Sequence, residues 1–71
     1  MGSEKVKLMT LLNYWISHNK EHSREFREWA DKARGFCEVE VSQGMIQAAQ
    51  DMDKAGESLS CALRRLEVKE R

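Results

Sequence analysis

Apolar residues recur over the first half of the chain at steps of three, four or seven positions, once His22 is counted as a member of the series. This spacing is typical of one face of an amphipathic helix, and it predicts a helix from about residue 4 to 33. Glu4 suits the positive end of that helix, and Lys32 and Arg34 suit its negative end. The series consists of Leu8, Leu11, Leu12, Trp15, Phe26, Trp29 and Ala33.

A second series with a three-four alternation follows Gly35 and predicts a helix from about residue 38 to 68. Gly35 can adopt the left-handed conformation that ends a helix, so we expect the turn at residues 34–37. Gly56 lies beside the second series, where close packing against a bulky neighbour would explain a glycine. The second series consists of Val41, Met45, Ala48, Met52, Ala55, Leu59, Ala62 or Leu63, and Leu66.

Two long helices joined by a short turn must lie antiparallel. The predicted fold is therefore all-α, one helical hairpin domain spanning residues 1–71. Pairing outward from the turn sets His22 opposite Met52, and His18 opposite Ala55 and Gly56. A single hairpin has only one seam, and chains of this size usually need oligomerisation or a staple for stability. We therefore expect a homodimer in which two hairpins form a four-helix bundle.

Composition excludes several partner classes. The chain has 12 Lys plus Arg and 12 Asp plus Glu, so it lacks the basic excess of a nonspecific nucleic-acid binder. No run approaches the roughly 20 apolar residues of a transmembrane helix. Cys37 and Cys61 are too few and too far apart for a disulfide framework, which favours a cytoplasmic protein.

His18 and His22 are the strongest candidates for chemistry. One helical turn apart, they lie with Glu25 in a cluster at the edge of the first series, with the spacing His-x3-His-x2-Glu. Nitrogen and oxygen ligands of this kind suit a transition metal such as nickel or zinc. The alternative is structural: histidines beside tryptophans often pack their rings and bond to a neighbouring carboxylate such as Glu21 or Glu25. Heme ligation and proton transfer are further alternatives.

Other polar residues favour structural roles. Asn19 lies near the opposite edge of the first series, where a buried asparagine can fix helix register. Cys61 is predicted on the outer face of the second helix and Cys37 in the turn, so neither pairs naturally with the histidines. The sequence offers no nucleophile, base and orienting group together, and we expect no enzyme activity.

The segment Trp15-Ile16-x-His18-Asn19-x-x-His22, followed by Phe26-Arg27-x-Trp29-Ala30, resembles a small two-helix domain of unknown function from archaea and anaerobic bacteria. The resemblance covers nearly the whole chain, and its specific part lies at positions 15 to 30. It implies a helical hairpin with a glycine turn. Some such domains are associated with small nickel-binding proteins, which would agree with a metal role for the histidines.

Two functions follow from these observations. The first is a small self-associating helical module with a structural or interaction role. The second is a metal-binding accessory protein in which His18 and His22 are ligands and Glu25 is a third ligand or an acceptor behind them.

Overall fold

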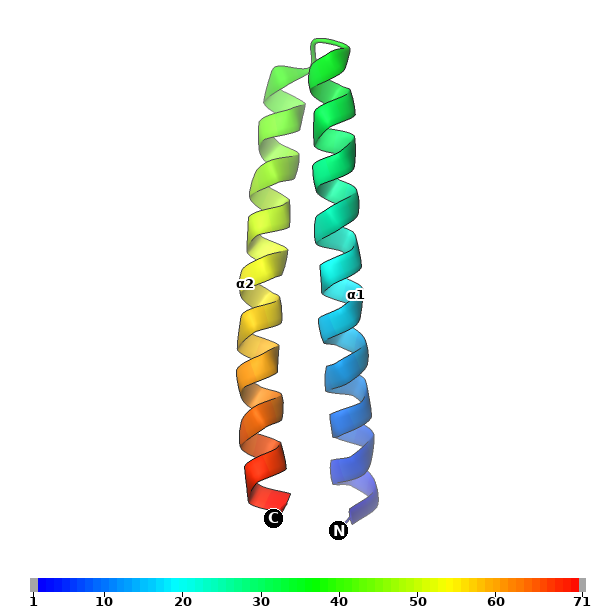
Figure 1. Ribbon diagram of the computed structural model, residues 1–71, viewed down its shortest axis with the longest axis vertical. Helices are drawn as coiled ribbons and strands as arrows, with labels where there is room; N and C mark the ends of the chain where they lie inside the picture. Colours follow the sequence, from blue (N-terminus) through cyan, green and yellow to red (C-terminus); the bar gives the residue numbers. More distant parts are fainter. Residues whose placement is uncertain (1, 71) are drawn as a thin grey trace.

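Two helices make up the part of the chain that the computed structural model describes, which is residues 2–70, with side chains for residues 2–68. Helix α1 spans Gly2–Gly35 and helix α2 spans Val39–Glu70. They lie antiparallel along their whole length, with both chain ends opposite the turn (Figure 1), in a molecule of 53 × 15 × 11 Å. The predicted all-α helical hairpin is confirmed, and the described residues contain no strand. Residues 1 and 71 of the predicted domain lie outside the described residues.

The helices meet along a seam with heptad spacing, in which one residue per half-heptad, small or apolar except at Asn19, faces the other helix. On α1 this seam consists of Leu12, Ile16, Asn19, Ser23, Phe26, Ala30 and Ala33. On α2 it consists of Ser42, Met45, Ala49, Met52, Gly56, Leu59, Leu63 and Leu66. All of these side chains are buried or half-buried.

Small residues make the tightest part of the seam. Ala30 and Ala49 are both 0% exposed. The hydroxyl of Ser23 donates to the backbone carbonyl of Ala49 at 3.3 Å, so the two backbones approach closely there. Leu12 and Ala33 are the other buried apolar side chains among residues 2–68, so this part of the hairpin has a thin core for its length.

The residues of the seam are not those on which the predicted series of apolar residues was centred. Trp15 and Trp29, predicted among the core positions, are 40% and 54% exposed. They lie one row away from the seam, because the close contact between two helices selects the small row of Ser23 and Ala30. The bulky row is left facing outward.

A charged contact closes the seam on one side. Arg27 of α1 donates to the carboxylate of Asp53 of α2 at 2.7 Å. Hydrogen bonds from Ser23 and Arg27 lower the pKa of Asp53. The rows of the two helices that meet on this side are polar apart from Ile46, and we call it the charged side. They include Lys20, Arg27, Asp53 and Glu67.

The turn differs from the prediction in one residue. Gly35 does not have a positive φ, whereas Cys37 does, at 68°. The backbone N–H of Glu38 donates to the carbonyl of Ala33 at 2.8 Å, and that of Cys37 to Arg34 at 3.1 Å. These two bonds form a Schellman motif whose left-handed residue is Cys37. The expectation that Gly35 takes the left-handed conformation was therefore wrong.

Placing a glycine at position 37 and removing the glycine at position 35 should each stabilise the hairpin. A non-glycine residue in the left-handed conformation is strained, so Cys37→Gly is expected to raise the free energy of unfolding by about 1 kcal/mol. Gly35→Ala should raise it by about 0.5–1 kcal/mol, since a Cβ at Gly35 meets no atom within 4 Å. Urea unfolding followed by circular dichroism, at one protein concentration, measures both.

Cys37→Ser is the matched control, because it removes the thiol and keeps the strain, and its stability should equal that of the wild type. A left-handed Gly35 would give the opposite pattern, with Gly35→Ala destabilising and Cys37→Gly without gain.

Candidate histidine pair and apolar face

Four rings form a ladder along one side of α1, because residues four apart on a helix lie above one another. Tyr14 stacks on His18 with ring centroids 5.3 Å apart. His18 meets His22 edge-on at 4.3 Å, and His22 stacks on Phe26 at 5.7 Å. Tyr14 was not predicted as a neighbour of the pair, although its spacing of four residues before His18 is the signal for that contact.

The two imidazoles are in direct polar contact. The Nε2 atoms of His18 and His22 lie 2.9 Å apart, so one carries a proton and the other accepts it. Two imidazolium ions could not share this contact, since each would offer only a donor.

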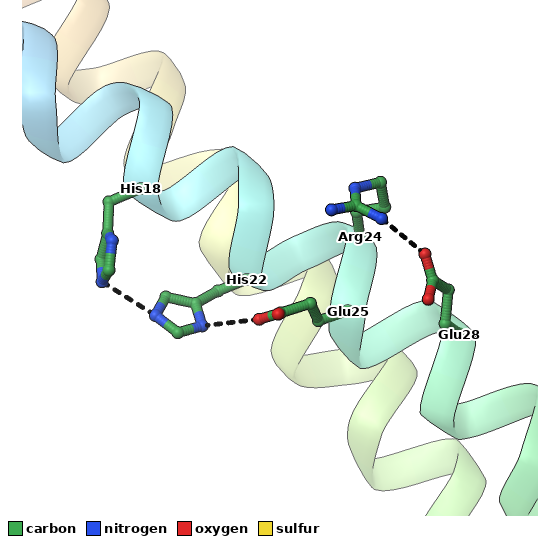
Figure 2. Close-up of polar contacts among 5 residues, drawn as sticks. All are labelled: His18, His22, Arg24, Glu25 and Glu28. Atoms are coloured by element: carbon green, nitrogen blue, oxygen red, sulfur yellow. Dashed lines mark hydrogen bonds and ion pairs between the residues drawn. The ribbon is translucent and has the colours of Figure 1, made fainter.

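Glu25 completes the row on the far side of His22. Its Oε1 atom lies 3.4 Å from Nδ1 of His22, and Figure 2 shows the three side chains in line. This carboxylate favours the tautomer of His22 with a proton on Nδ1, which leaves Nε2 as the acceptor for His18. The neighbouring pair of Arg24 and Glu28, 2.7 Å apart, is formed separately and does not reach the histidines.

Of the three predicted metal ligands, His18 and His22 lie with their Nε2 atoms close enough together to contact one metal ion. Metal–nitrogen bonds of about 2.0–2.1 Å hold adjacent ligand nitrogens roughly 2.9–3.4 Å apart, which the Nε2 atoms already match. The carboxylate of Glu25 faces Nδ1 of His22, on the side of the imidazole ring away from Nε2. Among the described residues, no group of three His, Cys, Asp or Glu side chains gathers in a way that could hold a metal ion.

The histidine row belongs to a larger apolar face. It lies beside the seam, opposite the charged side, and Leu8 of α1 and Ala62 of α2 line one shallow groove on it. We call this the histidine face. Its members are Leu8, Leu11, Trp15, His18, His22 and Trp29 of α1 with Val41, Ala48, Ala55 and Ala62 of α2. Leu8 is 42% exposed and Val41 is 51% exposed, and the ammonium of Lys32 lies 4.2 Å from the ring centroid of Trp29.

A protein-family model described as a domain of unknown function (DUF8180) matches residues 8–66. The chain belongs to this family. The match covers most of α1 and α2 and includes the histidine pair, in agreement with the resemblance to a small domain of unknown function. The distribution among archaea and anaerobic bacteria and the nickel association stay predictions. No curated protein and no solved structure matches the chain.

A groove on the charged side of this DUF8180 domain was not predicted. It has a volume of about 530 Å³ and is lined by residues that include Ile16, Lys20, Gly56 and Cys61. No atom lies within 4 Å of a Cβ built at Gly56, so the close packing expected at this glycine is absent. Neither helix, over its described length, is long and apolar enough to span a membrane.

Proposed function

We propose that this chain is a self-associating helical module with a structural or interaction role and no catalytic activity of its own. The observation that carries the proposal is the histidine face. Both tryptophans, two leucines and a valine lie on it, each at least 38% exposed. Apolar patches of this extent mark interaction sites.

The shape and charge of the face fit a second copy. The hairpin measures 53 by 15 Å in its two longer dimensions, so one full face covers about 800 Å², which is the area each partner contributes to a standard stable interface. The members of the face carry no fixed charge, and the charged groups beside it, Glu25, Lys32 and Arg65, lie at its edges, where they can stay in contact with solvent when two copies meet. Tryptophans are the residues that most often dominate binding energy at such interfaces.

The overall charge and the cysteines bear on which partners and which compartment suit the module. Equal numbers of acidic and basic residues give no general attraction to nucleic acid. Both cysteines are free and exposed, which suits a reduced, cytoplasmic setting.

Sedimentation equilibrium over a concentration series tests self-association. The wild type should be dimeric at tens of micromolar, and Trp15→Gln plus Trp29→Gln should weaken dimerisation at least 100-fold while retaining the helical signal. Val6→Gln plus Val68→Gln is the matched control, since these exposed valines lie outside the histidine face. A helical wild type that stays monomeric at high concentration would contradict the proposal, and so would equal effects of the two double variants.

A second candidate function is that of a metal-binding accessory protein, for nickel or zinc. It is supported by the 2.9 Å separation of the Nε2 atoms and by Glu25 behind His22, the arrangement in which a carboxylate orients a ligating imidazole. Water or further protein groups would complete the coordination.

Calorimetric titration of the purified apo-protein with nickel and zinc tests this function. His18→Ala plus His22→Ala should abolish binding, and wild-type affinity should fall as the pH is lowered, because protons and the metal compete for the same imidazole nitrogens. Glu25→Gln should weaken binding about 10–100-fold, whereas Glu21→Gln, the control, should not. Equal uptake by the wild type and the double histidine variant would rule it out.

A further inference from the structure

We infer that two copies of the hairpin pair with their turns at the same end of the bundle, so that α1 of each copy packs against α2 of the other. The inference rests on the self-association proposed above and adds the arrangement of the two copies. It follows from the different sizes of the two rows on the histidine face.

The two rows share one period but differ in bulk. Beside the seam, α1 presents Leu8, Trp15, His22 and Trp29, seven residues apart. On the same side, α2 presents Val41, Ala48, Ala55 and Ala62, also seven residues apart. A bulky row and a small row of equal period are the two halves of a knobs-into-holes contact.

A twofold axis can bring two histidine faces together in only two ways. With the turns at the same end, α1 lies on α2 of the second copy, and the bulky row meets the small row. With the turns at opposite ends, α1 lies on α1, so tryptophans oppose bulky side chains while alanine rows oppose each other across a gap. Interiors are close-packed, so the first arrangement is favoured.

The heights of the residues support the same choice. The hydroxyl of Ser23 bonds to the Ala49 carbonyl, which points along α2 toward residue 53, so Ser23 lies level with the α2 turn between Ala49 and Asp53. Counting outward from that level at 1.5 Å per residue in each helix, Ala55 falls between the heights of Trp15 and His22. Ala62 falls between Leu8 and Trp15, and Ala48 between His22 and Trp29. An axis parallel to the helices leaves these heights unchanged, so each alanine of the second copy faces a gap in the bulky row.

The arrangement has a consequence for the histidines. The α1 helices of the two copies lie diagonally across the bundle, so each imidazole pair packs against Ala55 of the second copy. The pairs stay separate, and a dimer would carry two equivalent two-histidine sites instead of one site with four.

Distances between spin labels on the turns test the arrangement. Cys37 is exposed and can carry a label when the other thiol is removed by Cys61→Ser. Turns at the same end should give a label–label distance of about 20–30 Å, from helix spacings of 8–10 Å and the label linkers. Turns at opposite ends of a molecule 53 Å long should give about 50 Å or more, which would overturn the arrangement and leave self-association intact. A helical protein without dipolar coupling would be monomeric and would overturn both.

Enlarging an alanine gives a second, independent readout. Ala55→Leu should weaken dimerisation at least tenfold, because the added atoms collide with Trp15 and His22 of the second copy. Combining it with Trp15→Ala should recover part of the loss. Opposite-end pairing predicts the reverse, since a leucine would fill the gap between alanine rows and strengthen the dimer. Ala55 is exposed in the hairpin, so the substitution leaves its seam intact.

Discussion

Ala49→Asp is expected to unfold the hairpin. Ala49 is 0% exposed, and the backbone of α1 approaches it closely enough for Ser23 to reach its carbonyl. A carboxylate there would lose its hydration and would lie one turn from the like charge of Asp53. Burial of an unpaired charge costs at least about 3 kcal/mol, against a total stability of about 4–10 kcal/mol for a chain of this length. The measurement is the helical circular dichroism signal at 25 °C, with a urea titration of any folded remainder.

Gln50→Asp is the matched control for this variant. It places the same residue type at the next position, where the side chain is exposed. Its stability should stay within about 0.5–1 kcal/mol of the wild type, the range of a helix-propensity change. Equal loss in both variants would show that the new charge acts through helix propensity, and that the close contact at Ala49 is not the sensitive point.

The helical hairpin could be predicted from the sequence because its evidence is local. Apolar residues repeat at helical spacing on both sides of Gly35, and a short connection leaves the second helix no arrangement other than antiparallel. The predicted helix limits, 4–33 and 38–68, lie within two residues of the observed ones.

The face that each helix turns toward the other could not be predicted in the same way. Helix α1 carries two rows with heptad spacing, one bulky, with Trp15 and Trp29, and one small, with Ser23 and Ala30. Hydrophobicity alone selects the bulky row. Two helices in isolation approach most closely through their small side chains, so the small row forms the seam. The pattern of one helix alone does not contain this contact between helices. The bulky row then remains for another partner.

The left-handed residue of the turn also could not be predicted from the local sequence. Glycine is the residue best suited to a left-handed conformation, so Gly35 was the natural choice. The 2.8 Å bond from Glu38 to Ala33 instead closes the helix two residues later and gives Cys37 the positive φ. The residue at which the chain reverses depends on how α2 packs against α1. The conformational preferences of the turn residues do not encode that packing.

The histidine pair was predictable because it lies within one helix. Spacing of four residues brings the imidazoles together, and spacing of three brings Glu25 to His22. Metal binding depends on ligands beyond these residues and stays a prediction.

Filling the loosest layer of the seam should raise stability. Asn19 is half-buried in the seam, and Gly56, across from this part of α1, would meet no atom within 4 Å if it carried a Cβ. Asn19→Leu replaces a partly desolvated amide by an apolar side chain and is expected to add about 1–2 kcal/mol to the free energy of unfolding. Gly56→Ala should add about 1 kcal/mol through helix propensity. Urea unfolding of the single and double variants measures the gain, which should be about 2–3 kcal/mol if the two add.

Two controls separate seam filling from general helix strengthening. Gly44→Ala changes an exposed helical glycine that also has no atom within 4 Å of its Cβ position, so it reports propensity alone. Asn13→Leu makes the same exchange as Asn19→Leu at an exposed site, where it removes a solvent-exposed hydrogen bond from the Asn13 amide to the Met9 carbonyl, and should change stability by less than about 0.5 kcal/mol. Asn19→Leu should exceed that control clearly, and Gly56→Ala should exceed Gly44→Ala by a few tenths of a kcal/mol, since its methyl group is half-buried.

A loss of stability in Asn19→Leu would mean that the amide makes an interaction stronger than apolar filling. A mixture of association states in that variant would assign Asn19 the role of fixing register, because a polar residue in a helical seam excludes alternative pairings at the expense of stability.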